Sequence, residues 1–352
     1  MFDRRLIQYF DWGLMGLAVL IGCIGLLTLY SAVTAETPAP QKILFFKQLL
    51  WFAVGLTAMV AAFLFNYKLL DRWAQPIYIF SISLLVAVLV FGKYIGGSRR
   101  WLIIGPVSFQ PSELVKIAVI ISLARYYSKD AKTKGFTLRE LVKPLMIVLL
   151  PVLLIGMQPD LGTAGLLVLI AGSITVFVRI ERRSFAYLIA SGAVLVPLIW
   201  FFYRDPLGAG YHIIQSKIAI GSGMLAGKGF LQGTQNALSF LPEEHTDFIF
   251  SVLAEEWGLL GSVTLVILFL VLIFWGLNVA SGCREPFGTI VAVGITGMIF
   301  WQVFINIGMA MGLMPVVGVP LPFISYGGSS VLATAVGIGL LLNVSMRRFM
   351  LE

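Results

Sequence analysis

Charge is the first thing that this sequence lacks. Aspartate, glutamate, lysine and arginine make up 12% of its 352 residues, against about 25% in a typical soluble domain. Hydrophobic residues make up 59% of the chain, and the mean hydropathy is +0.95. A soluble globular protein is therefore excluded, and the composition predicts a polytopic membrane protein.

Residues that build disulfides and metal clusters are also scarce. The chain has two cysteines, Cys23 and Cys283, and two histidines, His212 and His245. These numbers predict neither a disulfide framework nor a histidine-based metal site. A phosphate-binding loop of the G-x-x-x-x-G-K-S type is absent from the sequence, so hydrolysis of ATP is not expected. We also expect no nucleic-acid partner.

Long apolar runs make up most of the sequence. A membrane-spanning helix needs about 20 mostly apolar residues, and the sequence predicts about ten, at 13–34, 45–66, 74–92, 111–127, 144–158, 161–179, 184–202, 257–280, 287–311 and 322–345. Arg4 and Arg5 precede a run longer than the core of a signal peptide, so we expect the first span to be retained. The predicted fold is an all-α polytopic membrane protein of one domain, residues 1–352, with one long extracytoplasmic loop at 203–256.

Lysine and arginine set the expected orientation, because they are enriched on the cytoplasmic side. Most of the 25 fall inside if both termini are cytoplasmic; nine fall outside, namely Lys42, Lys47, Lys93, Arg99, Arg100, Lys116, Arg204, Lys217 and Lys228. An anionic ligand on the outer face is one explanation for them. Ordinary solvated loop charge is the other, and we favour it for Lys42 and Lys93.

The loop 203–256 is the long connection. Glycines punctuate it, and its isoleucines recur at helical spacing, which predicts short amphipathic helices on the membrane surface. Its end, Leu241–Trp257, carries five carboxylates and a histidine. Ionisable groups near a bilayer are costly to desolvate and are usually functional.

Asp247 begins an apolar helical pattern in this segment. At about 100° per residue, Ser251, Ala254 and Gly258 fall near its face, whereas Glu256 points the opposite way. A substrate has room to approach this small-residue face. Thr246 or Asp247 is equally suited to cap a helix, so cap and catalyst both remain open.

Two further segments contain ionisable residues on the outer side. Glu113 and Lys116 are three residues apart and are expected to pair on one helix face, and Pro111 suits a helix start. Arg99 and Arg100 have the guanidinium fork that fits phosphate oxygens. With Trp101 beside them, they are equally suited to anchor the chain at the membrane interface.

Asp160 precedes an apolar span, which predicts a helix N-cap. The segment Met314–Ser330 is broken by prolines and glycines before the last span. Irregular backbone at membrane depth is tolerated against protein or a water-filled cavity. Its serines, including Ser325 and Ser330, and Tyr326 are candidates to line such a cavity; loop packing alone is the alternative.

The chain resembles the SEDS family (shape, elongation, division, sporulation), and most closely its RodA branch. Five motifs in order support the resemblance: Gly97–Trp101 with Phe109–Lys116, Gln158–Thr163, Gly227–Gln235, Leu241–Phe250 and Leu321–Ser330. Lys228, within the Gly-Lys-Gly-Phe run, is more similar to RodA than to the division relative FtsW.

The resemblance implies a ten-helix peptidoglycan glycosyltransferase that polymerises lipid II on the outer face of the bacterial inner membrane. It implies a class B penicillin-binding protein, a transpeptidase, as partner and Asp247 as the catalytic residue. Glu113, Lys116 and Asp160 occupy the corresponding motif positions. Joining two lipid-linked sugars needs a base for the attacking hydroxyl and cations for the leaving pyrophosphate. The candidates are Arg99, Arg100, Lys116, Arg204 and Lys217, with a divalent ion such as Mg²⁺ or Mn²⁺ as a possible helper.

Two other functions fit the same architecture. A lipid II flippase also has buried charges in a polytopic bundle, although the sequence shows no internal repeat and its polar residues gather on one face. A membrane scaffold without catalysis, in which Asp247 is only a cap, is the third hypothesis.

Overall fold

The computed structural model describes residues 10–35, 42–95, 98–104, 107–129, 135–181, 184, 208–234 and 245–348. Within these ranges, six helices are long and apolar enough to cross a membrane. They are α2 Trp12–Ala35, α3 Lys42–Leu64, α4 Lys68–Phe91, α11 Ile249–Gly282, α12 Pro286–Ala310 and α13 Gly328–Arg347. The chain is therefore a mostly helical protein built on apolar spans.

Three shorter helices occupy the predicted fourth, fifth and sixth spans. They are α5 Pro111–Lys129, α6 Leu138–Gly156 and α7 Leu161–Phe177. Charged residues such as Lys116 and Arg139 set α5 and α6 apart from the six apolar helices. The predicted seventh span, 184–202, lies outside the described residues except at 184, so a total of about ten spans stays a prediction.

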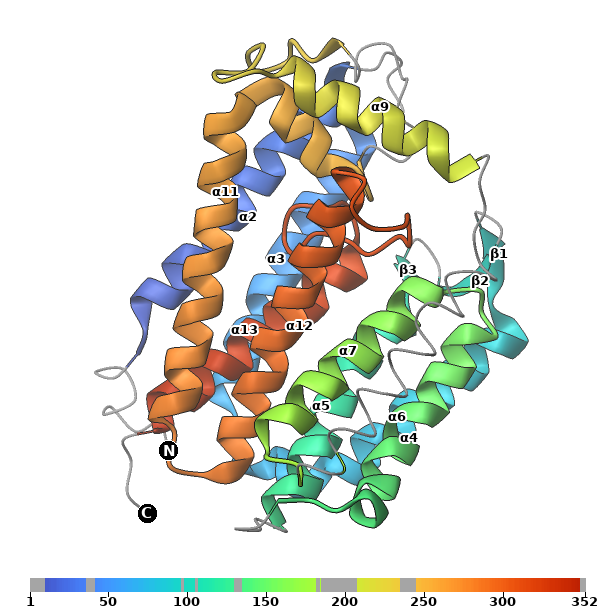
Figure 1. Cartoon of the computed structure of the whole chain (residues 1–352), viewed down its shortest axis with the longest axis vertical. Coiled ribbons are helices and arrows are strands. Elements are labelled where there is room, and N and C mark those ends of the chain that lie inside the picture. Colours follow the sequence, from blue (N-terminus) through green and yellow to red (C-terminus); the bar gives the residue numbers. More distant parts are fainter. Residues whose placement is uncertain are drawn as a thin grey trace.

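The helices form a bundle in which α12 and α13 are central (Figure 1). α13 packs closely along α3, and α12 packs against α5, α7 and α11. Both central helices are buried over most of their length. Side chains of α2, α3, α4 and the outer part of α11 project from the bundle as large exposed hydrophobics, which is the pattern expected of a surface in contact with lipid.

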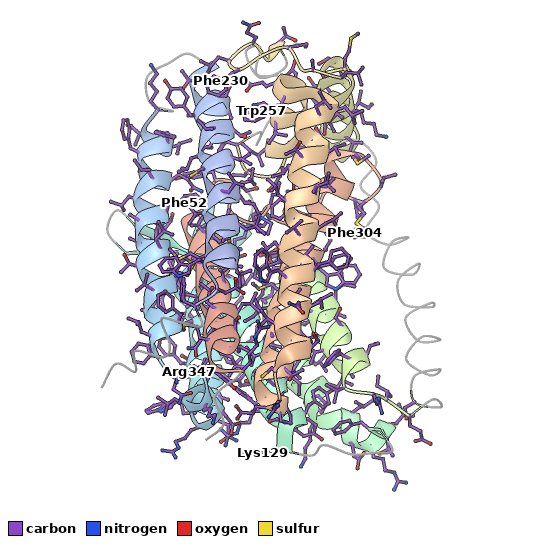
Figure 2. The ribbon with its side chains drawn as sticks, turned by 90° about the vertical axis from the view of Figure 1, so that its left-hand side faces the viewer. Phe52, Lys129, Phe230, Trp257, Phe304 and Arg347 are labelled. Carbon is purple, nitrogen blue, oxygen red and sulfur yellow. The ribbon has the colours of Figure 1, made fainter. Side chains whose placement is uncertain are left out.

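The two ends of the bundle can be told apart by where the ends of the chain and the basic residues lie. Asp11 accepts a hydrogen bond from Trp275 Nε1 at 2.9 Å, and Ser345 Oγ lies 3.4 Å from the same carboxylate. The beginning of α2 and the end of α13 therefore lie together. Lys129 and Arg347 lie toward this lower end, whereas Phe230 and Trp257 lie at the opposite one (Figure 2).

A small antiparallel sheet was not predicted and corrects the all-α expectation. Its strands, in the order β1-β2-β3, are Lys93–Ile95, Ser98–Ile104 and Val107–Phe109. Leu102 pairs with Phe109, and Ile104 with Val107. Gly-Gly and Gly-Pro pairs separate the strands in the sequence, and such pairs favour tight turns. The connection between the predicted spans 74–92 and 111–127, which we took for a loop, is therefore a small sheet before α5.

The loop predicted at 203–256 contains one surface helix and part of a span. α9, Gly208–Ser222, crosses one end of the bundle (Figure 1), in agreement with the predicted surface helices. α11 begins at Ile249, eight residues before the predicted span. Gly258 has φ +66° and ψ −162° and breaks α11 there, because a residue without Cβ tolerates positive φ. Residues 203–207 and 235–244 lie outside the described ranges.

Candidate active site at the outer end of the bundle

Asp247 is held by its backbone at the junction of three elements. Asn306, buried in α12, donates from Nδ2 to Asp247 O at 3.1 Å and to Val319 O at 2.8 Å. Ser325 Oγ donates to Thr246 O at 2.6 Å and accepts from Leu321 N at 2.8 Å. The N-cap residue of α11 is Phe248, which makes no side-chain cap bond. The N-cap position thus lies one residue after Asp247, and a capping role for Thr246 or Asp247 stays a prediction.

Arg100 reaches the same site from the sheet. Its Nη1 lies 3.9 Å from Asp160 Oδ1, and its side chain is 29% exposed while that of Asp160 is 1% exposed. The distance is too long for a hydrogen bond, and Arg100 Nε has no partner among the described residues. The guanidinium therefore keeps donors for a ligand.

Gly318 brings Asp247 and Arg100 together. A Cβ at this position would lie 3.4 Å from Asp247 Oδ2 and 3.9 Å from Arg100 Nη1. Gly318 has φ +67°, a conformation that glycine adopts without strain. A carboxylate and a guanidinium from segments far apart in the sequence thus flank one bend of the loop after α12.

Asp160 caps α7, as predicted. Its Oδ1 accepts from Thr163 N at 3.2 Å, and its Oδ2 accepts from Thr163 Oγ1 at 2.9 Å. Gln110, just before α5, donates from Nε2 to Asp160 Oδ2 at 3.1 Å, and its backbone N–H donates to Ser329 Oγ at 2.9 Å. These contacts join the beginnings of α5, α7 and α13.

Four helices therefore begin around this site: α5 at Pro111, α7 at Leu161, α11 at Ile249 and α13 at Gly328. Tyr326 N donates to His245 O at 2.9 Å, which links the starts of α11 and α13. The N-terminus of a helix carries a partial positive charge and favours anions. Together with Arg100, the four helix ends give the site the electrostatics of an anion-binding surface.

The Glu113–Lys116 pair is confirmed. Lys116 Nζ lies 2.8 Å from Glu113 Oε2, and the two side chains are 1% and 2% exposed. Charges buried to this degree are tolerated only when they are paired. The pair lies inside the bundle on α5, so the structure favours the structural interpretation of Lys116.

The other predicted cations take different positions. Arg99 is exposed on β2. It points to the face of the strand opposite to that of its neighbour Arg100, because successive side chains of a strand alternate between the two faces. Lys217 on α9 lies against Gly312 after α12: a Cβ at Gly312 would come 2.3 Å from Lys217 Cε. Arg204 lies outside the described residues. The structure places Arg100 at the same bend as Asp247, beside Gly318.

The predicted serines and Tyr326 lie in and after the broken segment. Ser325 uses its hydroxyl on backbone atoms, as described above, and Ser330 is buried in the first turn of α13. Burial raises the pKa of the Tyr326 phenol, which favours the neutral form. Their contact with substrate stays a prediction.

Three residues of this site were not predicted from the sequence: Asn306, Gln110 and Gly318. Asn306 had a detectable signal, since a polar side chain inside an apolar span is usually functional or partnered. Gln110 belongs to a motif that was noticed for its charges alone. Gly318 had no local signal beyond the glycine itself.

This arrangement brings one carboxylate, that of Asp247, and one guanidinium, that of Arg100, to the same bend after α12. Among the described residues, no group of three or more His, Cys, Asp or Glu side chains is placed to hold a metal ion. The site therefore fits the transfer of an activated, anion-linked group.

Known proteins with the same features include enzymes of cell-wall synthesis. A family model described as cell cycle protein, which covers FtsW, RodA and SpoVE, matches residues 11–349. Peptidoglycan glycosyltransferase MrdB of Escherichia coli K12 is 42% identical over 93% of this chain and 92% of its own length. Stage V sporulation protein E of Bacillus subtilis is 39% identical over 95% and 96%.

Solved structures agree with these relatives. A chain from a peptidoglycan synthase complex, studied for its coordination of polymerization and crosslinking, superposes with TM-score 0.81 at 33% identity and covers 97% of this chain and 98% of that one. The crystal structure of Thermus thermophilus rod shape determining protein RodA gives 0.74 at 31% identity, with 97% and 98% covered. The sequence match, its length and the shared fold show that this chain belongs to the FtsW, RodA and SpoVE family.

Proposed function

We propose that this chain is a RodA-type peptidoglycan glycosyltransferase, which polymerises lipid II into glycan strands, with Asp247 as the general base. The observation that carries the proposal is the meeting of Asp247 and Arg100 at Gly318, among four helix N-termini. A base and an anion-binding group in one place are what this transfer needs.

The reaction joins two lipid-linked disaccharides. The sugar 4-hydroxyl of one attacks the anomeric carbon of the other, and undecaprenyl pyrophosphate leaves with the bonding electrons. The hydroxyl proton passes to the Asp247 carboxylate. A positioned base of this kind contributes about 10²–10⁴ in rate. The substrate carries its own activation in the pyrophosphate bond, so ATP is not needed.

Arg100 neutralises the charge that develops on the pyrophosphate. Guanidinium and phosphate form bidentate pairs, and the loose contact with Asp160 leaves the fork able to turn toward the ligand. The helix N-termini add backbone N–H groups of fixed direction, which need no reorganisation during the reaction. Lys217 and Arg204 are proposed as further cations for the leaving group.

A divalent ion such as Mg²⁺ or Mn²⁺ is compatible with this site. Asp247 would hold it together with phosphate oxygens of the substrate, since Mg²⁺ is often bound by one or two carboxylates plus substrate phosphates. Its role would be to neutralise part of the leaving-group charge. Activity in the presence of a chelator, with and without added Mg²⁺ or Mn²⁺, tests this proposal.

The proposed location is the bacterial inner membrane, with the active site on the extracytoplasmic face and both termini cytoplasmic. The common position of the start of α2 and the end of α13 supports termini on one side. Lys129 and Arg347 lie toward that same end, as the enrichment of positive charge in the cytoplasm requires.

The proposed partner is a class B penicillin-binding protein, the transpeptidase of the elongation complex. The similarity to a chain of a peptidoglycan synthase complex supports a partner of this kind. We place the chain in elongation and rod-shape maintenance, since identity to MrdB, 42%, exceeds that to Geobacter sulfurreducens FtsW, 37%.

Incubation of the purified protein with lipid II in detergent tests the proposal against a flippase and a scaffold. Without a sealed bilayer, a flippase gives no signal, and a scaffold makes no product. The proposal predicts a ladder of glycan products from the protein, alone or with its transpeptidase. Absence of polymer in both conditions, with correctly folded protein, would contradict it.

A further inference from the structure

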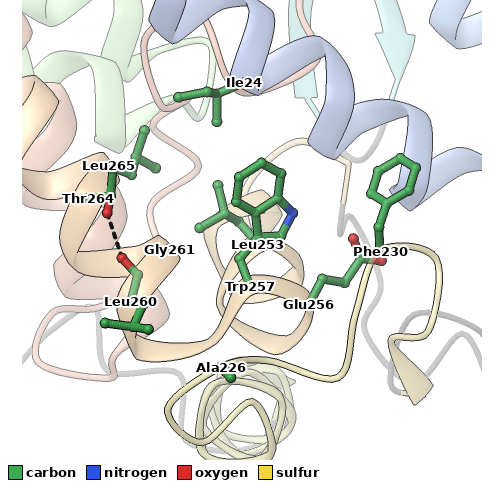
Figure 3. A pocket seen from close by; sticks show the side chains of 10 residues that line it. All are labelled: Ile24, Ala226, Phe230, Leu253, Glu256, Trp257, Leu260, Gly261, Thr264 and Leu265. Carbon is green, nitrogen blue, oxygen red and sulfur yellow. Dashed lines mark hydrogen bonds between the residues drawn. The ribbon is translucent and has the colours of Figure 1, made fainter.

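A cavity lies beside α11, next to its break at Gly258. It has a volume of about 400 Å³ and lies between α2, the loop after α9 and the break in α11 (Figure 3). Ile24 and Leu265 form its apolar floor, and Phe230 and Trp257 form its aromatic walls. The cavity is at the outer end of the bundle, where Phe230 and Trp257 lie in Figure 2.

One charged side chain lines this cavity. Glu256 is 2% exposed, and Ser31 Oγ, near the end of α2, donates to its Oε1. The other oxygen, Oε2, has no hydrogen-bond partner among the described residues. The backbone N–H of Leu231 also donates a hydrogen bond to this carboxylate. A buried carboxylate oxygen without a partner costs free energy, so this atom needs a donor.

The loop after α9 fixes the shape of the cavity. Lys228 Nζ pairs with Glu255 Oε1 at 2.6 Å, and Thr234 N donates to the same oxygen at 2.9 Å. Backbone bonds from Leu259 and Leu260 to Met224 and Leu225 hold the loop to the break in α11. Lys228 therefore pairs with Glu255 and not with the neighbouring Glu256, which lines the cavity.

The surroundings of the cavity are those of a lipid-facing surface. Leu260, at its rim, is 66% exposed, and Leu27 on α2 is 48% exposed. Phe230 stacks on Tyr30 at 6.4 Å between ring centroids, which suits the membrane interface, where aromatic side chains are enriched. A ligand with an apolar tail and a polar head at the interface can enter from the bilayer.

We propose that this cavity binds the primary-ammonium headgroup of a membrane phospholipid, of the phosphatidylethanolamine type. The ammonium donates to Glu256 Oε2 and lies against the Trp257 indole, whose face attracts cations. The acyl chains lie along the exposed apolar surfaces of α2 and α11. An anionic headgroup would be repelled by the carboxylate, and a trimethylammonium head has no N–H to donate.

The proposal separates this lipid site from catalysis. Glu256 contacts α2, whereas Asp247 is held by α12 and by the loop before α13. A bound lipid here fixes the broken part of α11 where it faces α2. Its test therefore uses lipid retention and does not depend on the glycosyltransferase activity.

Native mass spectrometry of the delipidated full-length protein, with added phosphatidylethanolamine, phosphatidylglycerol or phosphatidylcholine of the same acyl chains, tests the proposal. We expect phosphatidylethanolamine to be retained roughly tenfold better than the other two, the order expected from one hydrogen bond to a charged group. Glu256→Gln keeps the shape and the acceptor for Ser31 but removes the charge, and is expected to abolish the preference.

Glu181→Gln is the matched control, because Glu181 is an exposed carboxylate outside the cavity; it should keep the preference. A Trp257→Phe variant should reduce the preference in part. Equal retention of the three lipids by the parental protein would overturn the proposal. So would a preference that survives Glu256→Gln, or a selective gain of a partner polypeptide that displaces the lipid from the parental protein alone.

Discussion

Two ion pairs in this bundle show how similar residues take different roles. Glu113 and Lys116 lie on adjacent turns of one helix, 2.8 Å apart, and are almost fully buried. Arg100 and Asp160 come from a sheet and a helix start, are 3.9 Å apart, and Arg100 is partly exposed. We call the first pair closed, because both of its charges are buried and in contact with each other. We call the second pair open, because Arg100 is partly exposed and not hydrogen-bonded to Asp160.

The difference lies in what else each partner does. Asp160 already accepts bonds from Thr163 and Gln110, so it needs little from Arg100. Lys116 and Glu113 have only each other among the described residues. A closed pair stabilises the fold, whereas an open one leaves a cation available to a ligand. The following variants test this distinction.

The largest effect is expected at Asp247. Asp247→Asn keeps the size of the side chain and its backbone contacts but cannot accept a proton from a hydroxyl. Polymerisation should fall by about 10²–10⁴ with unchanged folding, as measured by glycan products and thermal unfolding. Near-parental synthesis by a folded Asp247→Asn protein would rule out the base role.

The closed pair should affect stability. Glu113→Ala or Lys116→Ala leaves one buried charge without a partner, which costs about 3–5 kcal/mol in unfolding free energy. The double Glu113→Ala/Lys116→Ala variant should lose less than the two single losses combined. Thermal unfolding in detergent measures all three. A fully stable but inactive Lys116→Ala protein would place the lysine in the substrate site.

Arg100 and Arg99 form a matched pair of neighbours. Arg100→Lys keeps the charge but removes the fork, and lipid II turnover should fall about tenfold, as for loss of one charged hydrogen bond. Arg99→Lys, on the exposed face of β2, should have little effect. Equal effects of both substitutions in a lipid II titration would show that Arg100 does not bind the pyrophosphate in preference to Arg99.

The smallest effect is expected at Asn306. Asn306→Ala removes both bonds that hold the Asp247 and Val319 carbonyls. We expect a loss of about 1–3 kcal/mol in stability and a partial fall in turnover. Asn306→Leu, which lacks the donor at similar size, should behave alike. Parental turnover with Asn306→Ala would show that Asp247 is positioned by other contacts.

Local sequence rules predicted the local features of this site. The spacing of Glu113 and Lys116 and the position of Asp160 before an apolar run each depend on a single helix. Both were confirmed because neighbours within one helix are set by its geometry.

Contacts between distant segments could not be predicted. Choosing between Arg99 and Arg100 needed the strand register of Ser98–Ile104, which we had read as a loop. The meeting of Asp247, Arg100 and Gly318 depends on how the sheet, α11 and the broken segment pack. The N-cap position of α11 is Phe248, one residue after Asp247, because the helix begins at Ile249. Each of these is set by tertiary packing, which outweighs local preference.

Lipid II binding and turnover, measured side by side for Asp247→Asn and Arg100→Lys, test the central claim most directly. The claim is that Asp247 does the chemistry and that the open Arg100 holds the pyrophosphate. It predicts parental lipid II affinity without product for Asp247→Asn, and weakened affinity with residual product for Arg100→Lys. Lost binding in Asp247→Asn together with parental binding in Arg100→Lys would contradict it.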